Sequence, residues 1–307
     1  MSREIPNWQR AGRTALTPMV WGTTYLVATE LLPEQRPLLA ATLRALPVGV
    51  LFLVATRRLP SGPWWWRSVV LGVLNIGAFF ALLFVAAFRL PGGVAATAGA
   101  LQPLMAAGLA GVVLREALTR RTVVAGLVGV VGVAMLVLGP DARLDTVGVV
   151  AALAGAASMA TGVVLTKHWG RPVDLVTFTG WQLTAGGLFL LPMLLAVEGL
   201  PDGLTARHAA GFAWLALIGT GLAYANWFRG VQQLPVAAVS TLGLLSPVVA
   251  TLLGWVVVGE TLTAIQSVGA FAVLVAVVLP QLHDRPGLRT RARPWEPAPV
   301  RRRLGRT

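Results

Sequence analysis

Arg44 is the one charged residue that lies well inside an apolar stretch of this sequence, at residues 37–56. A charge at the centre of a membrane helix costs about 2.5–3.5 kcal/mol on insertion scales, so such a residue usually has a compensating role. A guanidinium binds a carboxylate through two parallel hydrogen bonds. We therefore predict that Arg44 contacts an anionic group of a substrate. The alternative is that it snorkels to the nearer membrane surface.

Uncharged polar and aromatic residues inside apolar stretches could complete a binding site. With Arg44, the predicted substrate contacts are Trp21, Asn75, Gln102, Trp181, Gln182, Tyr224, Asn226 and Ser246. The tryptophans could form apolar or cation–π walls around a ligand, or they could pack against lipid. The polar side chains could contact substrate, or they could hydrogen-bond between helices. Both roles remain open for each residue.

The sequence contains no arrangement typical of hydrolysis, phosphate binding or metal binding. It has no cysteine, and its three histidines fall at predicted helix ends or in loops, away from any Asp or Glu cluster. A Gly-rich phosphate-binding loop is also absent, so ATP is not the expected energy source. We predict no catalytic residue, no metal and no cofactor. Among the carboxylates, Glu30 is the one that comes closest to the position expected of a proton carrier.

These side chains belong to a chain that is too apolar for a soluble protein. Of its 307 residues, 56% are hydrophobic and only 12% are charged, whereas soluble domains usually carry about 25% charged residues. Ten apolar runs are long enough to span a bilayer, and they lie at 15–33, 37–56, 67–88, 92–114, 122–139, 147–166, 174–197, 209–230, 235–257 and 264–282. We expect an all-α integral membrane protein with ten transmembrane helices.

Residues 90–119 and 234–263 match in register at a constant offset of 144, with thirteen of thirty positions identical. Because each half would hold five helices, the second half would enter the membrane from the opposite side, which is an inverted repeat. The predicted division of the chain is a cytoplasmic segment at 1–14, five-helix repeats at 15–139 and 147–282, and a disordered basic cytoplasmic tail at 283–307.

Two prolines, Pro103 and Pro247, occupy matching positions inside the repeated stretches. Proline removes the hydrogen bond to the carbonyl four residues earlier, which belongs to Gly99 and Gly243. Paired helix breaks in the two halves indicate a binding site near the membrane midplane. A packing kink without ligand contact is the alternative.

The repeat also pairs Glu116 with Glu260, thirteen residues beyond each proline. That separation is about 20 Å along a helix, so each glutamate lies near a membrane surface. We interpret both as structural residues, with gating as the alternative.

Basic residues favour a cytoplasmic location for both ends of the chain. With the N-terminus inside, the inner segments hold twenty of the 25 basic residues and the outer loops hold four, Arg44 being the remaining one. This asymmetry follows the positive-inside rule. Much of the excess positive charge lies after residue 283. In a membrane protein we interpret such a basic tail as a cytoplasmic anchor rather than as a nucleic-acid site. The arginine-rich composition suggests a bacterial plasma membrane protein.

Two five-helix halves, "WGTTYLV" in the first apolar stretch, and "P…E.LT" at the end of the fourth and ninth resemble the EamA family of the drug/metabolite transporter superfamily. The resemblance covers about residues 15–282. It implies a ten-helix inverted-repeat fold and secondary transport of small metabolites, often export of amino acids or related compounds.

The alternative function is an integral membrane enzyme or a flippase that acts on lipid-linked substrates. Such an enzyme would normally show acidic or histidine pairs at a helix end, and the sequence has none. The sequence leaves the oligomeric state undecided. The expected partners are a small-molecule substrate and the lipid bilayer, with no nucleic acid.

Overall fold

The computed structural model describes residues 6–33, 35–89, 92–137, 145–201, 203–259 and 262–282. Every regular element within these ranges is a helix. The predicted tail at 283–307 and the predicted motif residue Glu260 lie outside the described residues.

Five helices run without interruption. They are α1 (Asn7–Leu31), α2 (Pro37–Thr56), α7 (Arg120–Val137), α8 (Thr146–Trp169) and α9 (Leu175–Val197). The α2 bounds coincide with the predicted stretch at 37–56. The first helix starts earlier than its predicted apolar stretch, because a polar helical turn from Asn7 onward precedes the apolar residues.

The remaining helical segments are interrupted by changes of helix type or by short turns. One consists of α3 (Trp64–Gly72), the π-helical η1 (Val73–Gly77) and α4 (Ala78–Arg89). Another consists of α10 (Ala206–Ala213), the π-helical η2 (Trp214–Leu222) and α11 (Ala223–Gln233). The others are α5 (Gly92–Gly99) with α6 (Gln102–Val113), α12 (Val236–Leu242) with α13 (Leu245–Leu253) and the π-helical η3 (Gly254–Val258), and α14 (Ala264–Val278) with the 3₁₀ turn η4 (Leu279–Leu282).

Nine helical segments among the described residues are long and apolar enough to cross a membrane. Together they make the chain a multi-pass membrane protein. The nine do not include α1, whose 25 residues would extend about 37 Å but whose N-terminal half carries Arg10, Arg13 and two threonines.

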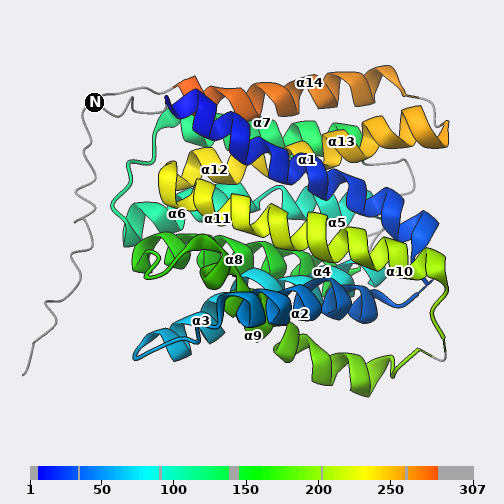
Figure 1. Cartoon of the computed structure of the whole chain (residues 1–307). Helices are drawn as coiled ribbons and strands as arrows, with labels where there is room; N and C mark the ends of the chain where they lie inside the picture. The colour runs from blue at the N-terminus through cyan, green and yellow to red at the C-terminus, as the bar shows by residue number, and fades with distance from the viewer. Residues whose placement is uncertain are drawn as a thin grey trace, which may run out of the picture.

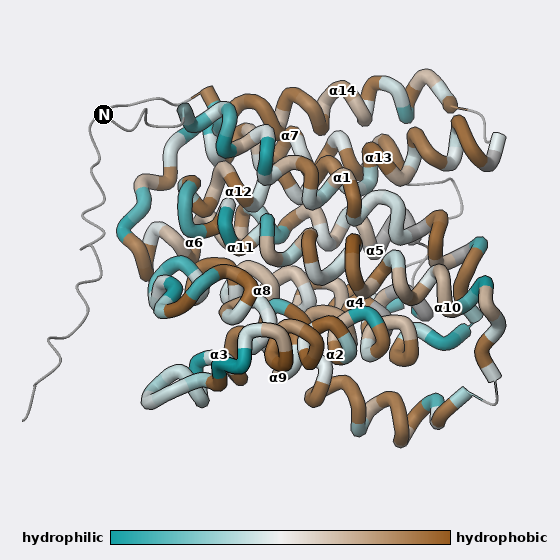
Figure 2. Tube along the Cα trace, viewed as in Figure 1, coloured by the Kyte–Doolittle hydropathy of each residue, from teal (hydrophilic) through white to brown (hydrophobic). Residues whose placement is uncertain are grey.

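The helices lie side by side in one bundle (Figure 1). The start of α1 and the end of α14 are at the same end of this bundle, at the left of Figure 1. Hydrophobic residues run along most of each helix, and hydrophilic residues gather toward the helix ends (Figure 2). This distribution is the one that a protein surrounded by hydrocarbon requires.

Glycines allow α2 and α9 to pack with their backbones in close approach. A methyl group at Gly49 would lie 2.5 Å from the backbone nitrogen of Thr184. A methyl group at Gly187 would lie 2.8 Å from Cα of Leu46. Residue numbers rise along one helix as they fall along the other, so the two helices run antiparallel.

The pair formed by α7 and α14 packs in the same way. A methyl group at Gly132 would lie 2.9 Å from the backbone nitrogen of Val273. A methyl group at Gly129 would lie 3.4 Å from Cβ of Ala276. These two helices are also antiparallel, and small residues at such contacts are typical of membrane helix packing.

The fourth and ninth helical segments are both interrupted just before a proline. In the fourth, α5 ends at Gly99 and α6 resumes at Gln102, one residue before Pro103. In the ninth, the turn after Leu242 places the Ser246 N–H 3.1 Å from the carbonyl oxygen of Gly243, to which it donates a hydrogen bond. Pro247 has no N–H to donate to the Gly243 carbonyl, so the Ser246 N–H takes its place as the donor.

Alanine at Gly49 and at Gly108 should affect stability in opposite directions. The Gly49 change forces a methyl group into the α2–α9 contact and should cost about 1–3 kcal/mol. The Gly108 position on α6 has no atom within 4 Å of an added methyl group, so this change should be neutral or stabilise the helix by up to about 1 kcal/mol. Unfolding of the purified variants in detergent measures both values, and equal stability would contradict the packing described above.

Candidate functional site

Arg44 lies in the N-terminal half of α2 and is only 7% exposed. Its Nε donates a hydrogen bond to Oγ1 of Thr220 at 3.0 Å, and its Nη2 donates to the carbonyl oxygen of Gly219 at 3.3 Å. Among the described residues, no carboxylate forms an ion pair with it. Neutral dipoles therefore hold the buried cation in place without cancelling its charge, which leaves it available to an anion.

Both acceptors of Arg44 belong to the π-helical turn η2. A π-helical turn departs from the regular α-helical hydrogen-bond pattern and often marks a functional position. The Gly219 carbonyl accepts from Arg44 and also from the indole Nε1 of Trp21, at 3.1 Å. This carbonyl thus orients one side chain from α2 and one from α1.

Aromatic rings surround the guanidinium. The Arg44 Cζ lies 4.8 Å from the ring centroid of Phe80, within the range of a cation–π interaction. The Trp21 ring lies 5.1 Å from the rings of both Tyr224 and Trp227. Tyr224 in turn meets Phe80 edge to face at 6.5 Å. The site combines one cation with large apolar and aromatic surfaces.

A second polar group joins α9, η1 and α8. Nδ2 of Asn75 donates to Oε1 of Gln182 at 2.9 Å and to Oγ1 of Thr166 at 3.1 Å. All three side chains are fully buried. Oδ1 of Asn75 and Nε2 of Gln182 have no hydrogen-bond partner in the described part of the chain, so this group retains capacity for a polar ligand.

The other predicted contacts lie apart from these two groups. Asn226 donates to the carbonyl oxygen of Arg13 and to Thr17 Oγ1, at 2.7 and 3.0 Å, and so fastens α11 to α1. The indole of Trp181 donates to the Arg58 carbonyl at 2.8 Å.

Gln102 and Ser246 flank the two helix breaks and are both half-buried. Nε2 of Gln102 is buried without a partner in the described residues. Neither side chain has a described hydrogen bond to Arg44, which leaves Trp21 and Tyr224 as its predicted companions.

Three residues at the site escaped the sequence analysis: Phe80, Gly219 and Thr220. Phe80 is one of many aromatic residues in an apolar stretch and carries no distinguishing signal. The offset of 144, however, aligns Gly219 with the predicted contact Asn75. The repeat therefore carries a sequence signal for the position of η2.

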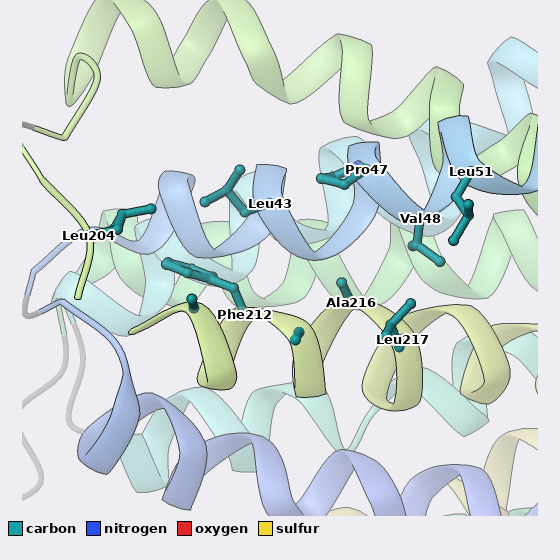
Figure 3. Close-up of a pocket in the computed structure, with 10 residues that line it drawn as sticks. Leu43, Pro47, Val48, Leu51, Leu204, Phe212, Ala216 and Leu217 are labelled. Carbon is teal, nitrogen blue, oxygen red and sulfur yellow. The ribbon is translucent and has the colours of Figure 1, made fainter. Parts of the chain in front are cut away.

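A pocket of about 320 Å³ opens between α2, α10 and η2. Figure 3 shows Leu43, Val48, Phe212 and Leu217 lining it. Its lining side chains are all apolar, and none of them is a predicted substrate contact. The pocket therefore offers hydrophobic contact alone, whereas the site around Arg44 offers charge and hydrogen bonds.

Apolar helices enclosing a buried cation and an aromatic wall define a multi-pass membrane protein with an internal polar site. The chain belongs to the EamA-like transporter family, whose sequence profile matches residues 14–138 and again residues 146–280. The family resemblance seen in the sequence is thereby confirmed.

Relatives of known name cover most of the chain. It is 46% identical over 266 residues to "Protein PecM" of Dickeya dadantii, covering 86% of this chain and 89% of that protein. It is 27% identical over 282 residues to a "Probable amino-acid metabolite efflux pump" of Salmonella typhimurium, covering 86% and 92%. A solved crystal structure matches with a TM-score of 0.75 at 20% identity, over 89% of this chain and 98% of that one, and supports the fold.

Replacing Thr220 with valine should destabilise the protein, because valine has the shape of threonine but leaves Nε of Arg44 without its acceptor. A buried donor left unpaired costs about 1–3 kcal/mol. Thr220→Ser keeps the hydroxyl and should retain most of the stability. Chemical or thermal unfolding in detergent compares the two, and identical values for both variants would rule out the Arg44–Thr220 hydrogen bond.

Proposed function

We propose that this protein is a secondary transporter that exports small polar or amphipathic metabolites, such as amino acids, across a bacterial plasma membrane. The observation that carries the proposal is the buried, unneutralised guanidinium of Arg44 beside an aromatic wall. The substrate carries a carboxylate that Arg44 binds through paired hydrogen bonds. Trp21, Phe80 and Tyr224 contact its apolar part.

Family membership supports transport, and the relatives support export. A relative that covers most of the chain is named an amino-acid metabolite efflux pump. A family profile that matches twice is what a chain built from two related halves produces. Alternating access then follows from movement of some helices against others around a shared site.

The α2–α9 contact supports an inverted repeat. In this earlier part of the chain the two halves match at an offset of 138, at which Gly49 corresponds to Gly187, and Leu46 corresponds to Thr184. Gly49 meets Thr184, and the corresponding residue Gly187 meets Leu46. Such an exchange of equivalent contacts is the signature of a two-fold axis.

The α7–α14 contact gives the same result independently. At the offset of 144, Gly129 corresponds to Val273 and Gly132 corresponds to Ala276. Gly132 meets Val273, and Gly129 meets Ala276. Because the paired helices are antiparallel, the axis that relates them lies in the plane of the membrane.

The two polar groups obey the same relation. Arg44 corresponds to Gln182, and the Arg44 acceptor Gly219 corresponds to the Gln182 partner Asn75. The repeat therefore supplies two equivalent positions, of which one carries a cation and the other a neutral amide. Only the position on α2 attracts an anion, which makes Arg44 the main determinant of substrate charge.

In the proposed topology all ten helical segments cross the membrane, and both ends of the chain are cytoplasmic. A reporter that works only in the cytoplasm should then be active when fused after Leu282. A reporter that works only outside should be active when fused after Gly199. If α1 does not cross while the N-terminus stays inside, both signals reverse. That reversal would overturn the inverted repeat as well.

Arg44→Gln should be inserted normally and lose most transport, because it removes the charge while copying Gln182 of the other half. Arg44→Lys should retain part of the activity, since it keeps the charge and loses the two-pronged geometry. Untargeted comparison of metabolites inside and outside cells, with and without the protein, identifies the substrate and measures both variants. Normal export by Arg44→Gln, or an organic cation as substrate, would refute the carboxylate assignment.

A further inference from the structure

One carboxylate joins three helix ends at the left-hand end of the bundle in Figure 1. Oε1 of Glu116 lies 2.8 Å from Nζ of Lys167, and Oε2 of Glu116 accepts a hydrogen bond from the backbone N–H of Val236 at 2.8 Å. Lys167 also donates to the carbonyl of Leu234. The Glu116 side chain is only 20% exposed, and the Lys167 side chain is only 17% exposed.

These contacts connect helices that belong to different halves of the chain. Glu116 follows α6, whereas Lys167 lies in the last turn of α8 and Val236 is the first residue of α12. A carboxylate at the N-terminus of α12 and an ammonium group near the C-terminus of α8 are both favoured by the helix dipoles. The interaction therefore holds the two halves together at one end.

The polar side chains next to this contact are closed to solvent. Thr166, which directly precedes Lys167, is fully buried, as are its donor Asn75 and the second acceptor of Asn75, Gln182. Ser240, one helical turn beyond Val236 on α12, is fully buried too. These side chains, at the end of the bundle that the proposed topology places in the cytoplasm, are thus closed off from solvent in this structure.

We propose that Glu116 and Lys167 form an ion-pair latch that closes the cytoplasmic entrance of the translocation path. The latch includes the Val236 N–H, so opening it releases the start of α12 from α6 and α8. Substrate then enters from the cytoplasm. The proposal rests on the proposed transport function and on cytoplasmic ends, and it assigns Glu116 a gating role instead of a purely structural one.

Glu198 provides a comparison of the same chemistry. Its carboxylate accepts hydrogen bonds from the backbone N–H groups of Leu38 and Leu39, at 2.6 and 2.9 Å, at the start of α2. Those contacts join α9 to α2, whose backbones meet at Gly49 and Gly187 along the same seam. A pair packed so closely moves as one unit, so Glu198 is a static helix cap and a matched control.

The test uses the fact that the chain contains no cysteine. A single cysteine at Ser240 reports whether α12 has opened, and Ser240 suits this change because its hydroxyl has no hydrogen-bond partner in the described residues. A charged, membrane-impermeant thiol reagent is applied to inside-out vesicles, which expose the cytoplasmic face. The measurement needs no substrate, so it separates failure of the latch from failure of the transport proposal.

In this background, Glu116→Gln keeps an acceptor for Val236 and removes the charge that binds Lys167. It should raise the labelling rate about fivefold, the shift expected for loss of a modest ion pair. Lys167→Gln should act in the same direction, Lys167→Arg should label as slowly as the parent, and Glu198→Gln should leave the rate unchanged.

Equal labelling of Glu116→Gln and the parent would overturn the latch and leave Glu116 as a structural cap. If Glu116→Gln does not reach the membrane, Lys167→Gln decides the question by the same comparison. If Glu198→Gln raises the labelling rate as much as Glu116→Gln does, the proposal is also refuted, because both changes would then reflect general loosening of the bundle.

Discussion

A guanidinium enclosed in a membrane protein must find its hydrogen-bond partners inside the protein, because the surrounding hydrocarbon supplies none. Arg44 meets this requirement through the carbonyl of Gly219 and the hydroxyl of Thr220. Both acceptors come from η2, a stretch in which the helix departs from regular α geometry. The irregularity of η2 and the charge on α2 therefore depend on each other.

Close helix packing makes this arrangement possible. Gly49 and Gly187 bring α2 against α9 and thereby fix the helix that carries the arginine. In a membrane, where apolar side chains gain little by leaving lipid, such close contact is a main source of helix association.

The sequence predicted the helices well because a span must be apolar for a fixed length, and this signal is local. It indicated less about which side chains of the site contact one another. Hydrophobicity shows where along the sequence a membrane helix lies, but packing between helices sets the direction of each side chain. Asn226 and Trp181 satisfied every local criterion for a site residue, yet they bond to the backbone of Arg13 and Arg58. The partners of Arg44 lie more than 170 residues away along the chain, where only the repeat could have indicated them.

The sequence repeat places a charge in one half of the chain and a neutral amide at the corresponding position of the other, since Arg44 corresponds to Gln182. Two corresponding polar positions exist, and the one on α9, Gln182, is neutral, buried and hydrogen-bonded to Asn75, which also donates to Thr166. An anion therefore gains charge pairing only at Arg44, toward the end of the bundle opposite the Glu116 contacts. If the Glu116 contacts close the cytoplasmic side as proposed, a carboxylate that leaves Arg44 would exit on the outer side. Arg44 in one half and Gln182 in the other thus make the two halves unequal toward an anion, although their helices correspond.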